Sequence, residues 1–255
     1  MHWSDEGIVI SARPHGETSL LCGLFTKERG RHMGLVRGGR SKALRPVCQA
    51  GNLVLVDWRA RLDEHLGMFV LELSEPIASR HLTSPLALSG LSTLCSHLSL
   101  FAERDPHGGL YEGAVYLLSQ LEDVSIWPGL LVRFELEVLS ELGVGLDLSA
   151  CAASGVRDDL VYVSPKSGRA VSREAGAPYH DKLLALPPFL INEQAPVSSQ
   201  DILAGLTLTG AFFDKYFWAP GLEVSGAVSP SGRGEGVPFA RQQLIKGLSR
   251  YFAAE

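Results

Sequence analysis

The first 80 residues alternate short apolar segments with turn signals, a pattern typical of a small all-β domain. The breaks contain glycine, proline or charged residues, as in Pro14–Gly16 and Leu62–His65. An open five-stranded sheet would leave two edges to protect, so the pattern favours a closed barrel. The five strands that we predict, with no helix between them, are Glu6–Arg13, Thr18–Phe25, Arg31–Val36, Asn52–Arg59 and Gly67–Leu73.

Beyond Pro76 the apolar residues recur at helical spacing. Ser84 before Pro85 predicts an N-cap with proline at the first helical position, and Gly143 predicts a helix stop. The sequence therefore predicts a mainly α-helical region after the barrel. The expected helices are Pro85–Phe101, Leu110–Leu121, Pro128–Leu142, a short one at Lys182–Leu186, Ser199–Phe217 and Pro238–Ala253.

Residues 144–180 lose the helical period and contain a β-like segment, Leu160–Val163, which indicates a small irregular insert. Gly221–Gly236 is rich in glycine and serine and is predicted to be a mobile loop. The expected fold class is α+β, with a barrel domain at 1–80 and a helical domain at 81–255 that the insert at 144–180 interrupts. Among five-stranded barrels, the oligonucleotide- and oligosaccharide-binding (OB) fold is the first candidate.

Composition indicates an ordinary globular protein, with 45% apolar and 20% charged residues. No apolar run approaches the roughly 18 residues of a membrane span, and the acids near the N-terminus do not fit a secretory signal. The four cysteines are scattered and form no C-x-x-C pair, which argues against a disulfide framework. We therefore expect a cytoplasmic protein.

Positive charge is concentrated in one segment, Lys27 to Arg45. This segment has a formal charge of +6, whereas the whole chain has −5, so the remainder has −11. Such a contrast predicts an anionic partner: nucleic acid, a phosphorylated ligand or an acidic protein tail. The competing interpretation is a solvated loop kept basic for solubility. The candidate phosphate contacts are Lys27, Arg29, Arg31, Arg37, Arg40, Lys42 and Arg45.

The same segment nearly matches the phosphate-loop motif G-x-x-x-x-G-K-[ST] between Gly34 and Ser41. Arg40 replaces the lysine, and a β pattern follows instead of the helix whose N-terminus would face a phosphate. A nucleotide-binding enzyme is therefore the least favoured alternative. The segment fits better as a flexible basic loop between two barrel strands, which would contact phosphates without reading bases.

Aromatic side chains supply the stacking that single-strand binding needs, and Trp58, near a strand end, is the candidate predicted to be exposed. Core packing is the competing interpretation for Trp3, Phe25 and Phe69. The eight histidines show no metal-ligand spacing, and no nucleophile elbow occurs. We expect no catalytic residue, no metal site and no cofactor.

A second class of function is a helical adaptor that binds an acidic, hydrophobic peptide without contacting DNA. Arg133 lies beside the apolar stripe of the helix predicted at 128–142 and could anchor a carboxylate. The competing interpretation is a helix-surface salt bridge with Glu137, four residues on. The other candidate cations for this site are Lys182, Lys215, Arg241 and Lys246.

Several short segments carry a family resemblance when taken in order. The first are Glu6–Ile10, Gly16–Thr18, Phe25-Thr26 and Gly30, followed by the basic glycine loop. Later ones are Arg133–Leu136 with Leu139, Glu141–Gly143 and Pro238–Arg241. Over nearly its whole length the chain resembles the RecO family of bacterial recombination mediators.

The resemblance implies an OB barrel, a helical domain with a zinc-finger-like insert, and a non-enzymatic, nucleoid-associated role in recombinational repair. It also implies binding of single- and double-stranded DNA, strand annealing, and loading of RecA, with RecR, onto DNA coated by single-strand-binding protein (SSB). The acidic C-terminal tail of SSB would dock on the helical domain. Seven phosphate contacts would give a log–log salt slope of about −5, but several cations make none, so we expect about −2 to −4.

The insert departs from the family pattern. Many relatives carry two C-x-x-C pairs there, but this chain has Cys151-Ala152-Ala153-Ser154 at the first and Arg173–Gly176 at the second. One sulfur cannot hold a tetrahedral zinc ion. We therefore predict an insert that folds without metal.

Overall fold

The computed structural model describes residues 1–218 and 238–254, which fall into two compact units. The first unit contains Met1–Val124, and the second begins at Ser125 and includes the C-terminal helix. The predicted mobile loop Gly221–Gly236 lies outside the described residues. The domain boundary expected near residue 80 stays a prediction.

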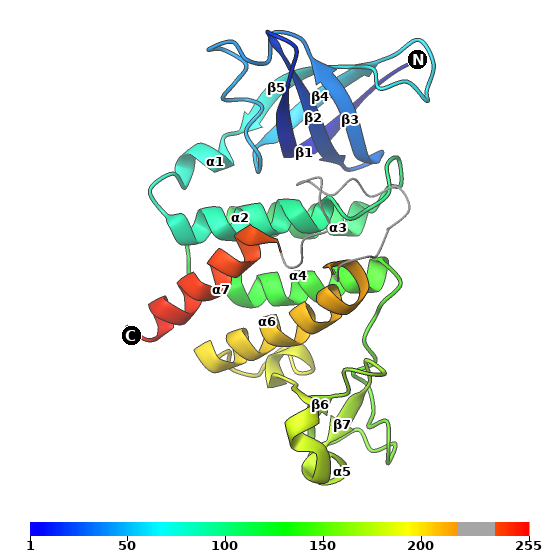
Figure 1. The fold of residues 1–255 in the computed structure, drawn as a ribbon, viewed down its shortest axis with the longest axis vertical. Helices are drawn as coiled ribbons and strands as arrows, with labels where there is room; N and C mark the ends of the chain where they lie inside the picture. The colour runs from blue at the N-terminus through cyan, green and yellow to red at the C-terminus, as the bar shows by residue number, and fades with distance from the viewer. Residues whose placement is uncertain (219–237, 255) are drawn as a thin grey trace. The chain divides into compact units, whose positions relative to one another are not determined.

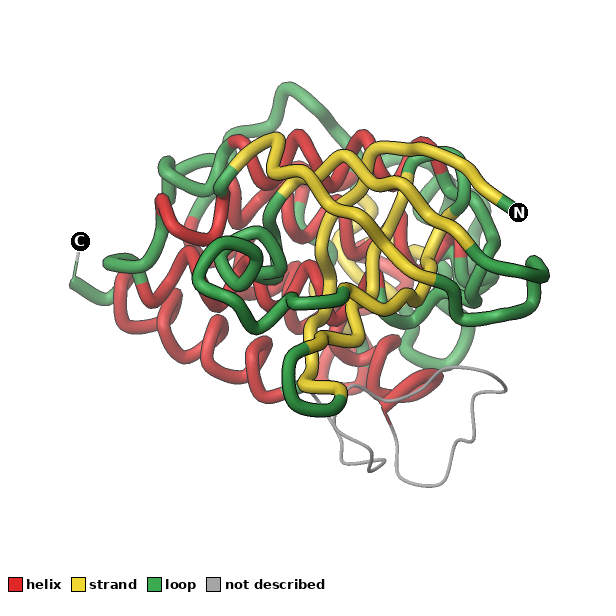
Figure 2. The backbone as a smooth tube through the Cα atoms, turned by 90° about the horizontal axis from the view of Figure 1, so that it is seen from above, coloured by secondary structure: helices red, strands yellow, loops and turns green. Residues whose placement is uncertain are grey.

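Five strands close into a barrel in the order β1-β2-β3-β5-β4, which confirms the predicted OB-type architecture (Figures 1 and 2). β1 and β4 pair antiparallel, as do β1 and β2, β2 and β3, and β4 and β5, whereas β3 and β5 pair in parallel at Leu35↔Met68. Closure leaves no long edge exposed. The strands are β1 (His2–His15), β2 (Ser19–Thr26), β3 (Gly30–Val36), β4 (Leu53–Arg59) and β5 (Met68–Glu75).

The prediction that Trp58 is exposed is wrong. Its side chain is 1% exposed, because it points into the barrel from β4 and stacks on Trp3, with ring centroids 5.5 Å apart. The indole N–H donates to the carbonyl of Leu66 at 3.1 Å, which satisfies its buried polar group. Trp58 is therefore part of the barrel core and unavailable for stacking on a base.

Three helices complete the first unit after the barrel: α1 (Ile77–Arg80), α2 (Pro85–Leu98) and α3 (Gly108–Ser119). The predicted cap of α2 is confirmed, since Ser84 Oγ accepts the N–H of Ala87 at 3.3 Å and Pro85 stands at the first helical position.

Helices α4 (Trp127–Glu141), α6 (Ser199–Phe213) and α7 (Phe239–Phe252) are the long helices of the described part of the second unit. A π-helical turn, η3 (Asp214–Trp218), follows α6. Gly143 ends α4 as predicted, with φ of +79° and its N–H bonded to the carbonyl of Ser140. In the part of the chain that the structure describes, no helix is long and apolar enough to cross a membrane.

The short helix expected at Lys182–Leu186 is wrong. A 3-10 turn, η1 (Ala177–Lys182), ends there, and strand β8 (Leu184–Ala185) follows. β8 pairs with Tyr162 and Val163, so sheet hydrogen bonds override the weak local helical pattern. A second 3-10 turn, η2 (Pro188–Leu190), precedes α6.

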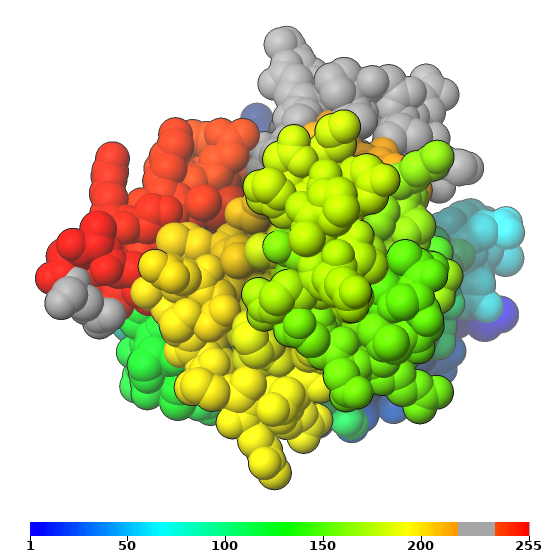
Figure 3. All heavy atoms as spheres, turned by 90° about the horizontal axis from the view of Figure 1, so that it is seen from below, coloured from blue at the N-terminus to red at the C-terminus, as the bar shows by residue number. Residues whose placement is uncertain are grey.

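The insert is a three-stranded sheet in the order β7-β6-β8, with β6 (Leu160–Val163) where the sequence predicted a strand. β7 (Ala170–Ser172) leads into the short α5 (Arg173–Gly176), and Figure 3 shows the insert in yellow-green. The buried Cys151 sulfur accepts the N–H of Ser172 at 3.3 Å and its hydroxyl at 3.5 Å. Among residues 1–218 and 238–254, no group of three or more His, Cys, Asp or Glu could hold a metal ion.

Candidate nucleic-acid interface

The basic segment does not form a single patch, because strand β3 runs through it. Lys27 and Arg29 lie in the turn before β3, Arg31 lies within it, and the other four cations follow it. Seven extended residues at about 3.3 Å each place the two groups roughly 20 Å apart. Each group therefore has to be assessed by its own contacts.

Arg31 is a structural residue, which corrects its assignment as a phosphate contact. Its side chain is 5% exposed, and its Nε donates to the carbonyl of Phe101 at 2.6 Å. Its Nη2 lies 3.6 Å from a carboxylate oxygen of Glu103. The guanidinium thus ties β3 to the segment after α2 and has no free face for DNA.

The two cations of the β2–β3 turn also have partners within the protein. Lys27 Nζ lies 3.4 Å from a carboxylate oxygen of Glu112 on α3, and the Arg29 guanidinium lies 6.0 Å from the ring centre of Trp3. Arg29 remains exposed, whereas Lys27 is half-buried. This turn is therefore a weaker candidate for phosphate contacts than the loop after β3.

The loop after β3 holds Arg37, Arg40, Lys42 and Arg45, all exposed. Arg40 Nη1 donates to the carbonyls of Glu17 at 2.8 Å and Gly16 at 3.3 Å, and its backbone N–H donates to Thr18. The loop therefore lies against the β1–β2 turn. In OB folds this turn is one of the loops that line the ligand-binding face.

The basic loop is anchored rather than flexible, which corrects the sequence-based interpretation. Leu44, Val47 and Cys48 pack with the core of the barrel. Asn52, which is buried, donates from Nδ2 to the carbonyl of Pro46 at 2.8 Å and accepts the N–H of Ala78 at 3.0 Å. The cations are thus presented from a fixed backbone, which lowers the entropy lost on binding.

One exposed basic residue close in sequence to the β1–β2 turn was missed by the sequence reasoning. Arg13 lies on β1, three residues before Gly16, the first residue of the turn that the basic loop contacts. Its sequence signal was weak because it is a single cation outside the charge cluster. The hairpin pairing of β1 with β2 puts Arg13 opposite Leu21.

The near phosphate loop has no nucleotide-binding geometry. Gly34 belongs to β3, and the residues from Arg37 to Gly51 form turns. Of the described residues, those between β3 and β4 include no α-helix. A phosphate would therefore meet no helix N-terminus there.

Arg241, expected to bind a partner's tail, is buried in the second unit. Its side chain is 3% exposed, and it forms two parallel 2.9 Å hydrogen bonds with the Glu135 carboxylate. The same guanidinium donates to the carbonyl of Leu206 and to the hydroxyl of Thr209, which also donates to Glu135. Arg241 thus joins α7 to α4 and α6 and is unavailable to a partner.

The other cations predicted to bind a partner's tail differ in whether their side chains have partners within the protein. Arg133 donates to the carbonyl of Phe189 at 2.7 Å, and the described residues contain no ion pair between it and Glu137. Lys215 donates to the carbonyls of Pro165 and Lys166. Lys182 and Lys246 are exposed.

The fold and the basic loop define a class: an OB-barrel protein joined to a helical domain that carries a small β insert. Family models described as Recombination protein O N terminal and Recombination protein O C terminal match residues 1–79 and 82–220. The chain belongs to the RecO family of DNA repair proteins.

Similar proteins share most of their length with this chain. The DNA repair protein RecO of Methylobacterium nodulans is 52% identical over 238 residues, covering 91% of this chain and 95% of the relative. RecO of Mesorhizobium japonicum is 53% identical over 224 residues, covering 86% and 87%. RecO of a Chelativorans species is 48% identical over 250 residues, covering 98% and 99%.

Proposed function

We propose that this RecO-family protein is a recombination mediator that binds single- and double-stranded DNA and anneals complementary strands. Annealing requires no catalytic residue. It requires two strands held together with their charge screened, which lysine and arginine side chains can supply by displacing counterions. The protein therefore acts as a non-enzymatic DNA-binding factor.

The observation that carries this proposal is the anchored basic loop. Arg37, Arg40, Lys42 and Arg45 are exposed on a loop fixed to the barrel core and to the β1–β2 turn. Four phosphate contacts would give a log–log salt slope of about −3 on single strands. This value falls within the range expected from sequence.

The partners that we propose are those that the family resemblance implies. We propose that the protein acts with RecR to load RecA onto SSB-coated DNA, and that the acidic SSB tail docks on the helical domain. Lys182 and Lys246 are exposed there, and Arg133 has further N–H groups beyond the one that Phe189 accepts. Arg241 is not part of this proposed site, because its buried side chain is paired with Glu135.

A strand-annealing and DNA-binding assay at two salt concentrations tests the loop. We expect the triple variant Arg37→Gln/Lys42→Gln/Arg45→Gln to bind more weakly and to reduce the salt slope by about 2. The matched control, Arg157→Gln/Lys166→Gln/Arg250→Gln, removes the same charge from exposed positions in the second unit. Equal losses in both triples, or salt-independent affinity, would contradict the proposal.

The adaptor alternative makes a different prediction for the same proteins. If the helical domain binds the acidic tail at a separate site, the loop triple variant should keep its affinity for a synthetic SSB tail peptide. Tail binding by a protein with no measurable affinity for DNA would favour an adaptor without DNA contact.

A further inference from the structure

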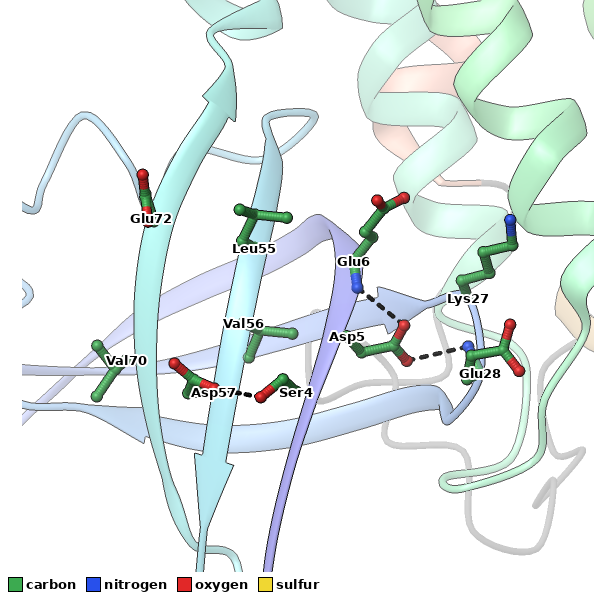
Figure 4. A pocket seen from close by; sticks show the side chains of 10 residues that line it. All are labelled: Ser4, Asp5, Glu6, Lys27, Glu28, Leu55, Val56, Asp57, Val70 and Glu72. Carbon is green, nitrogen blue, oxygen red and sulfur yellow. Dashed lines mark hydrogen bonds between the residues drawn. The ribbon is translucent and has the colours of Figure 1, made fainter.

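The outer face of β1, β4 and β5 forms an acidic hollow of about 580 Å³, and none of its lining residues belongs to the basic loop after β3 (Figure 4). The charged residues that line it are one lysine and five acids: Lys27, Asp5, Glu6, Glu28, Asp57 and Glu72. They come from three strands and the β2–β3 turn. Folding therefore gathers carboxylates that lie up to 67 positions apart in the sequence.

The floor of the hollow is aliphatic. Leu55 and Val70 line it and are 46% and 63% exposed. The register of the strands puts Leu55 opposite Glu6 on one side and Glu72 on the other, and puts Val70 beside Asp57. Apolar and acidic side chains thus alternate on one outward face of the barrel.

The negative charge of the hollow is only partly compensated. Lys27 pairs with Glu112, Asp5 accepts the N–H groups of Glu6 and Glu28, and Asp57 accepts the Ser4 hydroxyl. His2 Nε2 lies 3.6 Å from Asp57. Three carboxylates of the hollow form no ion pair within residues 1–218 and 238–254: Glu6, Glu28 and Glu72.

These properties limit what could occupy the hollow. The sign of the charge excludes nucleic acid, and in the described chain no acidic group is arranged to hold a metal ion. The barrel is closed, so an occupant would bind through side chains rather than as an added strand. Exposed aliphatic side chains ringed by unpaired carboxylates match a chain that carries both apolar and basic groups.

We propose that this hollow docks a partner-protein segment in which aliphatic side chains alternate with lysine or arginine. Glu6 and Glu72 flank β4, so their backbones lie about 10 Å apart, two interstrand spacings. Residues four apart in an extended segment lie about 13 Å apart, and long basic side chains bridge the difference. The site is independent of the proposed DNA-binding loop.

Fluorescence anisotropy with a labelled synthetic peptide tests the proposal on the full-length protein. The probe is Gly-Arg-Ser-Leu-Ser-Lys-Ser-Val-Ser-Arg-Gly, in which basic and aliphatic side chains share one face of an extended chain. We expect saturable binding, weakened about threefold to fivefold by Glu72→Gln and about tenfold by Glu6→Gln/Glu72→Gln. Val70→Ser, which changes no charge, should weaken peptide binding by about the same factor as Glu72→Gln.

Matched controls separate the hollow from general attraction. Glu64→Gln removes the same charge from an exposed loop position outside the hollow and should leave peptide affinity unchanged. A second peptide, with serine replacing leucine and valine, should bind more weakly. No saturable binding, equal loss with Glu64→Gln, or equal binding of the serine peptide or spermidine would overturn the proposal. DNA binding should be unchanged in all these variants.

Discussion

Arginine side chains have different roles in two regions of this protein: in one they are buried and paired, and in the other they are exposed. Between α4, α6 and α7, Arg241 is buried and donates two hydrogen bonds to the Glu135 carboxylate. It also donates to the carbonyl of Leu206 and to the hydroxyl of Thr209. In the loop after β3, Arg37 and Arg45 are exposed and have no carboxylate partner among the described residues. The first region uses positive charge to hold the fold, and the second presents it to solvent.

The difference shows that residue type alone does not identify a DNA contact. A buried guanidinium is stable only when its donors and charge are matched, so it cannot serve a ligand as well. An exposed one contributes little to stability and remains available. Both kinds occur within a single sequence cluster, since Arg31 is buried and Arg37, six residues on, is exposed.

The largest effect that we expect is a loss of stability when the buried Arg241–Glu135 pair is broken. Glu135→Ala leaves Arg241 charged and buried without its carboxylate, which should lower the free energy of unfolding by about 3–5 kcal/mol. Urea unfolding measures the loss. Glu137→Ala, an exposed position on the same helix, should change it by less than about 0.5 kcal/mol. Similar losses in the two variants would show that the pair is not a structural centre.

Removing the loop's anchor should have an intermediate effect. Asn52→Ala removes the side chain that bonds Pro46 and Ala78, and leaves the buried N–H of Ala78 and the partly buried carbonyl of Pro46 without that partner. We expect a loss of about 1–3 kcal/mol in unfolding free energy, together with weaker DNA binding. Asn192→Ala, at an exposed position, is the control for the substitution. Unchanged stability would mean that the loop holds its position without Asn52.

Two neighbouring arginines give a sharper test of the same contrast. Arg31→Gln should cost about 1–2 kcal/mol, because Phe101 and Glu103 lose their partner. Arg37→Gln should leave stability within about 0.5 kcal/mol and reduce the salt slope of DNA binding by about 0.7. Thermal unfolding and DNA titration measure the two effects. The reverse pattern would refute the division of the basic segment.

The smallest expected effect concerns the insert. Burial opposes ionisation of Cys151, yet hydrogen bonds from Ser154 and Ser172 lower its pKa from 9.0 to about 6. A lowered pKa in the folded state adds stability that is full above pH 9 and is lost as the pH falls to about 6. The difference in Tm between wild type and Cys151→Ser should therefore grow from pH 6 to pH 9.

Cys95 provides the control for this trend. Burial raises its pKa to about 12, so its thiol stays neutral over the same range, and the effect of Cys95→Ser should not change with pH. A flat difference for Cys151→Ser as well would mean that the Cys151 thiol is not ionised in the folded protein.

The sequence predicted the regular elements well, because alternation and helical spacing are local properties. β1 was predicted at Glu6–Arg13 but extends over His2–His15, since its polar first residues are ordered only by pairing with β4. The two-residue β8 was read as helix for a similar reason. Such segments gain their structure from partners far along the chain.

The candidate interface was predicted only in part. Charge density located the basic segment, but the burial of Arg31 depends on a carbonyl 70 residues away, at Phe101. Trp58 looked exposed between two charged neighbours, whereas the alternation of β4 turns it inward. The acidic hollow had no sequence signal, because its carboxylates are dispersed over 68 residues and meet only across strands.

The closure of the barrel has a mechanical consequence. Four strand pairs are antiparallel ladders of seven or more residue pairs, but β3 and β5 meet in register only at Leu35 and Met68, with Leu35 N–H bonded to the carbonyl of Gly67. Local opening starts where the fewest bonds must break. The barrel wall is thus a rolled sheet whose two ends meet at the short β3–β5 contact. The barrel can widen by opening this contact while every antiparallel ladder stays intact.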